Sequence, residues 1–154
     1  MNTFQKGAPP RPPLLSRERR LAVYGVAAGV WLTGVLWVIA HYFLAAEGEF
    51  GPVISPVEFW ALASHGGFAF ASLWVFGFLW GVHIVAGWRS HRRRWSGGAM
   101  FGLIIWLTIS GLLLYYLGSD ELIAPTMLLH WTTGLAAPLL FLLHRFAREP
   151  KKKG

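Results

Sequence analysis

The sequence predicts an all-α membrane protein built as a bundle of four transmembrane helices. Of its 154 residues, 55% are hydrophobic and only 14% are charged. Four apolar segments are each long enough to cross a bilayer, which takes about 20 apolar residues in a helix, and they leave too little chain for a soluble domain of ordinary size. All 14 Lys and Arg residues fall on one side of a four-span topology, as expected for a multi-pass protein.

The charged residues also predict the orientation of the chain. Because Lys and Arg are enriched in cytoplasmic loops, we expect both termini in the cytoplasm. Five of the seven acidic residues fall on the other side of the four-span topology: Glu47, Glu49, Glu58, Asp120 and Glu121. The net charge of +7 therefore indicates topology and contact with anionic membrane lipid, and argues against a nucleic-acid partner.

The chain begins with a Pro- and Arg-rich segment, residues 1–20, which we expect to be a cytoplasmic tail because Pro at this density favours extended chain. The first apolar segment, residues 21–44, is longer than the apolar core of a signal peptide, about 7–15 residues. We therefore expect a retained first helix, with His41 near its outer end. It opens the predicted transmembrane domain, residues 21–148.

The second apolar segment, residues 57–88, follows a loop of Gly and Pro turn residues at 45–56 and holds His65 and His83. A basic connection leads to the third segment, residues 95–117, which contains no His.

The fourth apolar segment, residues 123–147, follows a short polar loop and carries His130 and His144. A basic tail, residues 149–154, ends the chain.

Each of two apolar segments places a pair of histidines on one helix face. His130 and His144 are 14 residues apart, which at about 100° and 1.5 Å per residue leaves them on nearly the same face and about 21 Å apart. His65 and His83 are 18 residues apart, or about five whole turns. Ionisable side chains are costly inside a membrane, so paired histidines there indicate a functional site.

Two facing helices with this pattern form two bis-imidazole sites. Haem iron accepts His on both faces, and six-coordinate iron suits electron transfer. We therefore predict an outer haem held by His65 and His130 and an inner haem held by His83 and His144. The chain has no Cys, so the haems would be non-covalent, b-type haems. Zinc and iron–carboxylate sites fit less well, because they would need Cys or acidic ligands beside the histidines.

The helical rise leaves the outer ligand open. His65 and His83 are separated by about 27 Å of straight helix, against about 21 Å between the histidines of the fourth segment. A tilt of about 40° would match the two spans, and Pro138 is a candidate kink in the fourth segment. Otherwise His41 replaces His65 as the outer ligand.

Residues near the histidines have two interpretations each. Small residues could clear room for a flat ligand or serve ordinary helix packing: Gly66, Gly67, Gly87 and Gly134. Arg89 and Arg145 follow the inner histidines and are candidate partners of haem propionates or membrane anchors. His91, beside Arg92–Arg94, is a candidate quinone-site residue or a solvated loop residue.

Residues 57–148 resemble a known family through four motifs: His65-Gly-Gly, His83-Ile-Val-Ala-Gly-Trp88, Ser110-Gly-Leu-Leu-Leu114, and His130-x3-Gly134 followed by His144. The family is the small four-helix, di-haem cytochromes b of bacterial inner membranes, which are similar to the cytochrome b subunits of formate dehydrogenases and nickel–iron hydrogenases. The H-x13-H spacing is also similar to that in the cytochrome b of quinol–cytochrome c oxidoreductases.

This resemblance implies a multi-pass protein of the bacterial inner membrane with two non-covalent b haems. It further implies electron transfer between the quinone pool and a redox partner protein, expected in the periplasm, as a subunit of an oxidoreductase rather than as a stand-alone enzyme. One feature departs from the family. Several family members take an inner-haem ligand from the first helix, whereas the first segment here has only the outer His41. The alternatives to a di-haem cytochrome are a haem-free membrane anchor and a small His-lined proton or metal conduit.

Overall fold

The computed structural model describes residues 15–49, 51–90 and 93–146, and it confirms the four-helix fold class. Four helical spans are long and apolar enough to cross a membrane: Arg17–Phe43, Pro56–Arg89, Arg94–Tyr116 and Asp120–Phe146. The first span is the helix α1, the third span is the helix α4, and the fourth span is the helix α5. The second consists of α2 (Pro56–Leu79), a π-helical turn η1 (Trp80–Ile84) and α3 (Val85–Arg89).

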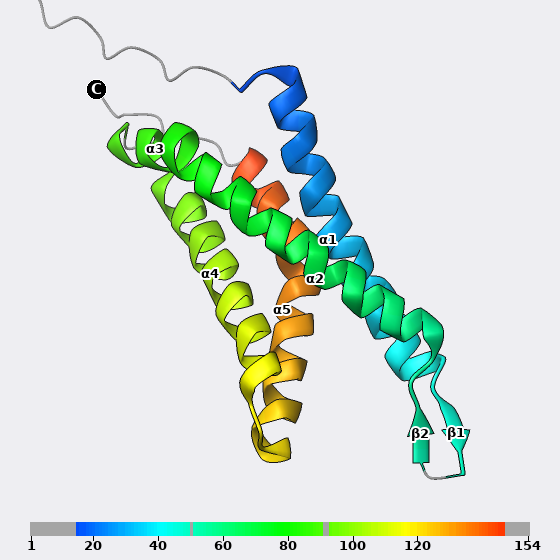
Figure 1. Cartoon of the computed structure of the whole chain (residues 1–154). Helices are drawn as coiled ribbons and strands as arrows, with labels where there is room; N and C mark the ends of the chain where they lie inside the picture. The colour runs from blue at the N-terminus through cyan, green and yellow to red at the C-terminus, as the bar shows by residue number, and fades with distance from the viewer. Residues whose placement is uncertain (1–14, 50, 91–92, 147–154) are drawn as a thin grey trace, which may run out of the picture.

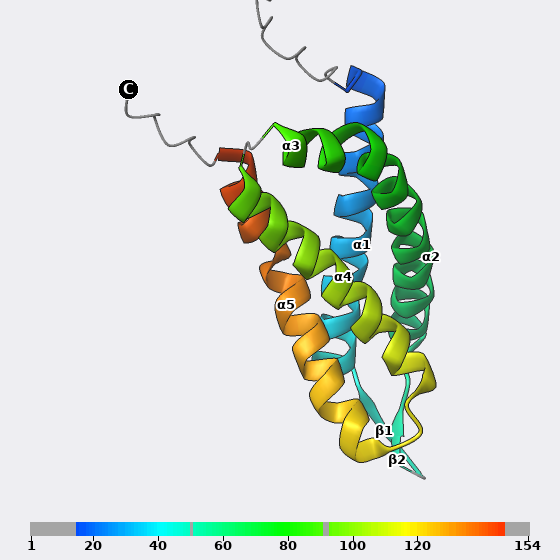
Figure 2. The same ribbon diagram turned by 90° about the vertical axis from the view of Figure 1, so that its left-hand side faces the viewer.

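The bundle is made of two antiparallel helix hairpins. The helix α1 packs along α2, and α4 packs along α5. The hairpins meet where α1 contacts α5 and where α3 contacts α4 (Figures 1 and 2). The apolar side chains on the outside of these helices, such as Trp74 at 81% exposure, are suited to contact lipid.

The charged residues of the described chain separate to the two ends of the bundle. Figure 1 shows the start of α1, the helix α3 and the end of α5 together at one end, which we call the basic end. Its described basic residues are Arg17, Arg19, Arg20, Arg89, Arg93, Arg94 and Arg145. The opposite end, here the hairpin end, holds the two strands and the turn between α4 and α5 (Figure 1). The charge separation expected from the sequence is thus present in three dimensions, and the cytoplasmic location of the basic end stays a prediction.

The helix α1 begins at Arg17, four residues before the predicted tail boundary. Ser16 is the N-cap residue, and its hydroxyl accepts a hydrogen bond from the Arg19 amide at 3.4 Å. Glu18 lies in the first turn, where a negative charge is favourable. The arginines therefore belong to the helix, and their long side chains let it extend past the apolar layer.

The loop predicted between the first two spans contains a short β-hairpin of β1 (Ala46–Gly48) and β2 (Gly51–Val53). The strands are antiparallel, with Ala46 opposite Val53 and Gly48 opposite Gly51. Gly51 has φ +114°, a conformation that favours glycine. The turn residues were recognised in the sequence, but the strands are too short to show a pattern.

The π turn η1 bends the second span. Figure 2 shows α2 running along the bundle and α3 turning across its end. A π turn makes i→i+5 hydrogen bonds and is a recognised cause of sharp kinks. The 34-residue span is therefore bent, whereas the estimate of helical rise from the sequence assumed a straight helix. Because His83 lies inside the π turn, its position cannot be calculated from a regular helical rise.

Of the residues that the structure describes, four are buried: Ala40, Glu58, Ala61 and Ser110. The two polar members each contact a histidine, Glu58 with His41 and Ser110 with His130. Each buried polar side chain is therefore within hydrogen-bond distance of a histidine.

We predict that reporters inserted into this chain will read the two ends of the bundle as opposite sides of the membrane. A reporter fused to the C-terminus should read cytoplasmic, because the basic residues gather at that end. A reporter inserted after Gly48 should read periplasmic, and one inserted after Gly118, between α4 and α5, should agree with it. Alkaline phosphatase and fluorescent-protein fusions measure this, and the reverse pattern would contradict the orientation.

Candidate bis-histidine sites

The structure brings four histidines together in two pairs. His65 of α2 and His130 of α5 have ring centroids 6.3 Å apart, and their ring planes are at 88°. His83 of η1 and His144 of α5 have ring centroids 6.2 Å apart, also at 88°. These are the two pairings expected from the sequence. We call the first the outer pair, because it lies toward the hairpin end, and the second the inner pair.

His41 lies apart from both pairs. Its Nδ1 is 2.7 Å from Oε1 of Glu58, and its ring stacks on Trp37 with centroids 4.8 Å apart at 17°. The structure thus places His65, rather than His41, opposite His130. The bend at η1 removes the difference in helical rise that had kept His41 as an alternative.

The separation within each pair fits a metal ion held between the rings. A metal–imidazole bond is about 2.0–2.1 Å long, and a ring nitrogen lies about 1.1 Å from its centroid, so two trans imidazoles have centroids about 6.3 Å apart. The observed values are 6.3 and 6.2 Å. The perpendicular ring planes are compatible with this arrangement, because binding through one nitrogen of each ring sets no angle between the two ring planes.

The outer histidines are oriented by hydrogen bonds at Nδ1. Nδ1 of His65 lies 2.9 Å from the Val30 carbonyl, which can only accept, so Nδ1 carries the proton. Nδ1 of His130 lies 2.8 Å from the Ser110 hydroxyl. That hydroxyl donates its single proton to the Trp106 carbonyl at 2.7 Å, so it accepts from Nδ1–H of His130. In both rings the lone pair is then on Nε2, which is free to bind a metal.

In the inner pair, one of the two rings is oriented by a similar hydrogen bond at Nδ1. Nδ1 of His144 lies 3.1 Å from the Ser96 hydroxyl, and that hydroxyl lies 3.4 Å from the Arg93 carbonyl. His83 instead takes its position from the π turn, a feature that is frequent at functional sites. The inner pair therefore combines a hydrogen-bonded ring with a ring placed by an irregular backbone.

Three glycines on the neighbouring helices make room for the imidazoles. A Cβ atom at Gly34 of α1 would lie 3.1 Å from Cε1 of His65, and one at Gly111 of α4 would lie 3.2 Å from Cε1 of His130. A Cβ at Gly97 of α4 would lie 3.6 Å from Cε1 of His144. A side chain at the first two positions would be unusually tight, so the ring would have to shift.

A hydroxyl residue followed directly by glycine lies beside three of the four paired histidines. Thr33-Gly34 contacts His65, Ser110-Gly111 contacts His130, and Ser96-Gly97 contacts His144. The two Ser-Gly copies are 14 residues apart, the same spacing as between His130 and His144. Since α4 and α5 are antiparallel, equal spacings place each copy beside one histidine. This match was visible in the sequence, but we used Ser110-Gly111 only for the family resemblance.

The four glycines that neighbour the histidines in sequence have two kinds of surroundings. A Cβ at Gly134 would lie 3.8 Å from Leu107, and one at Gly66 would lie 3.6 Å from the Tyr115 hydroxyl, which are ordinary packing distances. Among the described residues, a Cβ at Gly67 or Gly87 would meet no atom within 4 Å. The imidazoles themselves are accommodated by glycines of the neighbouring helices, and room for a flat ligand beside Gly67 and Gly87 stays a prediction.

The basic residues near the inner pair have different surroundings. The Arg93 guanidinium donates to the carbonyls of His144 and Arg145 at 3.3 and 3.1 Å, where it neutralises the end of α5. The Arg145 guanidinium lies 5.8 Å from the ring centroid of Phe146. Arg89 ends α3, and His91 lies outside the described residues.

A metal bound only by protein side chains does not fit these pairs. Across the described ranges, no group of three or more His, Cys, Asp or Glu side chains gathers around one point. Structural zinc sites take four protein ligands and catalytic ones take three. Haem supplies four equatorial nitrogens and needs only one or two axial ligands, so a pair of imidazoles fits that group.

Two buried polar atoms near the pairs also remain available to a cofactor. The indole Nε1 atoms of Trp31 and Trp131 are buried and have no hydrogen-bond partner in the described part of the chain. Trp131 directly follows His130. An unpaired buried donor is costly, and a polar group of a bound cofactor could accept from it.

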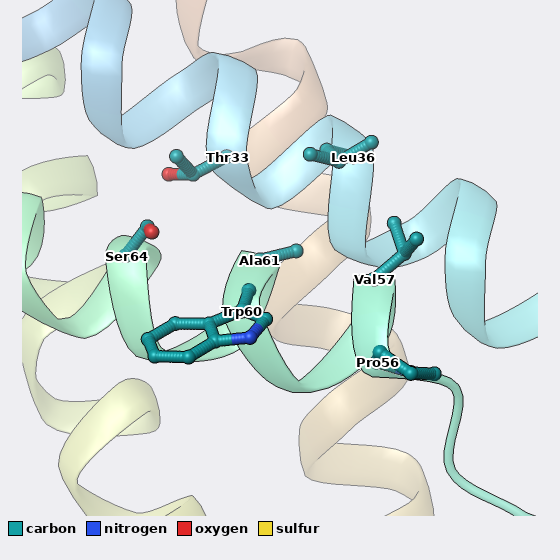
Figure 3. A pocket seen from close by; sticks show the side chains of 7 residues that line it. All are labelled: Thr33, Leu36, Pro56, Val57, Trp60, Ala61 and Ser64. Carbon is teal, nitrogen blue, oxygen red and sulfur yellow. The ribbon is translucent and has the colours of Figure 1, made fainter.

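The outer pair can be approached from the side of the bundle. A groove with a volume of about 360 Å³ lies between α1 and α2, and Figure 3 shows the side chains that line it. Its lining residues are Thr33, Leu36, Pro56, Val57, Trp60, Ala61 and Ser64. Thr33 also lies 3.3 Å from Nδ1 of His65, so the groove reaches a direct neighbour of the outer pair.

Comparison with known proteins adds no relative. No protein-family model, curated protein or solved structure matches this chain. The assignment of function therefore rests on the geometry of the histidines and on the sequence motifs.

We predict that Gly111→Val will destabilise the protein more than Gly102→Val. Both positions lie in α4, so the change in helix propensity is the same. The added side chain meets His130 only at position 111, whereas a Cβ at Gly102 meets no described atom within 4 Å. Overpacking of this kind costs about 1–3 kcal/mol. Thermal unfolding in detergent measures the difference, and equal melting temperatures would contradict the close contact.

Proposed function

We propose that this chain is a transmembrane di-haem b-type cytochrome that transfers electrons between membrane quinone and a redox partner protein. The observation that carries the proposal is the pair of bis-histidine sites with ring separations of 6.3 and 6.2 Å. Haem, when bound, supplies one-electron oxidation and reduction. His65 and His130 would hold the outer haem, and His83 and His144 the inner haem.

The residues around the histidines perform the tasks such sites require. The Val30 carbonyl and the Ser110 and Ser96 hydroxyls hold Nδ1, which keeps Nε2 as the ligand atom and prevents rotation of the ring. The glycines of the neighbouring helices let the rings approach these partners. If both imidazoles of a pair held a haem, they would leave no position open to oxygen, and the chemistry supplied there would be electron transfer.

The two sites lie at different depths along α5. His130 and His144 are 14 residues apart, which corresponds to about 21 Å of helix, a large part of a hydrocarbon layer of about 30 Å. One pair lies toward each end of the bundle. This arrangement supports electron transfer across the membrane, with each site serving one side.

The quinone and the partner protein are proposed from the sequence resemblance and from access. Quinones reach a protein through the lipid, and the groove beside Thr33 opens on the side of the bundle next to the outer pair (Figure 3). The proposed location is a bacterial inner membrane with the hairpin end in the periplasm. The chain would act as an electron-transfer subunit rather than as a stand-alone enzyme.

The principal alternative is a haem-free anchor in which the histidines only join helices. The Ser110–His130 contact, which connects α4 with α5, favours such a role. The contacts between the two hairpins argue against it. With ring centroids 6.3 Å apart, facing ring nitrogens would be about 4 Å apart, too far for a hydrogen bond. The spacing suits a metal between the rings better than a direct contact.

We predict that protein purified from haem-replete cells will carry about two haems per chain. Acid acetone should extract both haems, because the chain has no Cys to form thioether bonds. A visible spectrum and a pyridine haemochrome assay measure the haem-to-protein ratio. A colourless but folded preparation would end this proposal and favour the anchor.

We further predict that single His→Ala variants will separate the two haems. His65→Ala and His130→Ala should each lose the outer haem or convert it to a high-spin form, because one axial ligand is removed. His83→Ala and His144→Ala should do the same to the inner haem.

His41→Ala is the matched control and should keep both haems, since its ring contacts Glu58 and Trp37. Low-temperature spectra and haem ratios distinguish the five variants. Loss of a haem in His41→Ala together with two haems in His65→Ala would reverse the assignment of the outer ligand.

A further inference from the structure

His41 and the buried Glu58 form an acid–base pair that the two haem sites do not use. Glu58 is 8% exposed, and its Oε1 lies 2.7 Å from Nδ1 of His41. The His41 ring is covered on one face by Trp37 and meets the edge of Tyr42. A carboxyl and an imidazole at this distance can share or exchange a proton.

The carboxylate of Glu58 is not explained by its local sequence. Ser55 and Glu58 have the S-x-x-E spacing of a capping box, in which the Glu side chain would bond back to the start of its own helix. The first half of that motif is present, because the Ser55 hydroxyl accepts from the Glu58 amide at 3.1 Å. Oε1 of Glu58, however, bonds to His41 on another helix.

The pair lies between the outer histidines and the hairpin end. Glu58 is seven residues before His65 and His41 is seven residues after Gly34, the residue whose added Cβ would meet the His65 ring. Seven residues are about two turns, or about 10 Å, on the same helix face. Because α1 ends at Phe43 and α2 begins at Pro56, the aqueous phase is close by.

A change of charge at the outer pair would act electrostatically on His41 and Glu58 at this distance. Two groups about 10 Å apart interact where protein and lipid replace part of the water, because screening by water and ions is weaker there than in bulk solution. An electron added at the outer site therefore raises the affinity of His41 and Glu58 for a proton. Removal of the electron lowers that affinity.

We propose that His41 and Glu58 form a proton-exchange site that is coupled to the oxidation state of the outer haem. The site binds one proton from water at the hairpin end when the outer site gains one electron from a reductant, and it releases that proton when the electron leaves. One positive and one negative charge enter together, so the net charge of this region stays constant. The inference rests on the proposed function, because it requires a haem at His65 and His130.

Other titratable or charged groups at this end could contribute to pH dependence. They are Tyr42 on α1, Glu49 in the hairpin, His65 on α2, Tyr115 and Tyr116 at the end of α4, and Asp120, Glu121 and His130 on α5. Glu121 is exposed in the first turn of α5. It therefore provides a matched control for the loss of an acidic charge at the hairpin end.

A redox titration of the full-length holoprotein over a range of pH values tests the proposal. The outer haem is identified as the one lost in His130→Ala. Its midpoint potential should fall as pH rises, because the reduced state holds the extra proton. Glu58→Gln should remove most of this dependence, as should His41→Ala, whereas Glu121→Gln and the midpoint of the inner haem should retain the wild-type behaviour.

Infrared difference spectra between the reduced and oxidised protein provide a second measurement. They should contain a carboxyl signal that is absent in Glu58→Gln and present in Glu121→Gln. A pH-independent outer midpoint in a wild-type protein with two haems would overturn this inference and leave the proposed function intact. Unchanged pH dependence in His41→Ala would also overturn it, even if Glu58→Gln failed to fold. Absence of haem would overturn both proposals.

Discussion

The hydrogen bond between a histidine Nδ1 and an acceptor on the neighbouring helix is the interaction on which this bundle depends. In a membrane there is little water to satisfy a buried imidazole, so its polar atoms need protein partners. The Val30 carbonyl serves His65, the Ser110 hydroxyl serves His130, and the Ser96 hydroxyl serves His144. Each bond ties two antiparallel helices of one hairpin in a defined register.

This interaction requires close helix packing, and close packing requires glycine. At His130 and His144 the serine and the glycine are adjacent in the sequence, so one dipeptide supplies both the acceptor and the room for the ring. Gly34 and Gly111 permit ring contacts at which a Cβ would lie 3.1 and 3.2 Å away. The paired rings come from different hairpins, so both sites form where the hairpins meet.

The histidines of the two sites are positioned in different ways. The outer pair sits on regular helices and has hydrogen-bonded support on both sides, from α1 and from α4. The inner pair depends on the π turn that holds His83, close to the basic end. The outer pair also has the His41–Glu58 pair about two turns away, at the end of the bundle where the described acidic residues gather. The two sites are therefore surrounded by different charges and different proton-accepting groups.

The sequence by itself determined the four-helix fold class and identified the histidines that the structure brings together in pairs. Four long apolar segments, one-sided Lys and Arg residues and helical spacing of the histidines follow from local composition and periodicity. Those features are sufficient for the four-helix fold and for the pairing of α5 with the second span. The outer ligand stayed open between His65 and His41, because the estimate assumed a straight helix.

Only the tertiary structure decided which groups meet between helices. The π turn at Trp80–Ile84 has no distinctive composition, and it alone makes the second span bend and brings His83 to His144. Glu58 could not be assigned to His41 from the sequence, because its spacing from Ser55 also fits a local helix cap. The physical reason is the same in both cases: sequence periodicity describes one helix at a time, whereas the register between helices depends on side-chain hydrogen bonds and close packing across their interface.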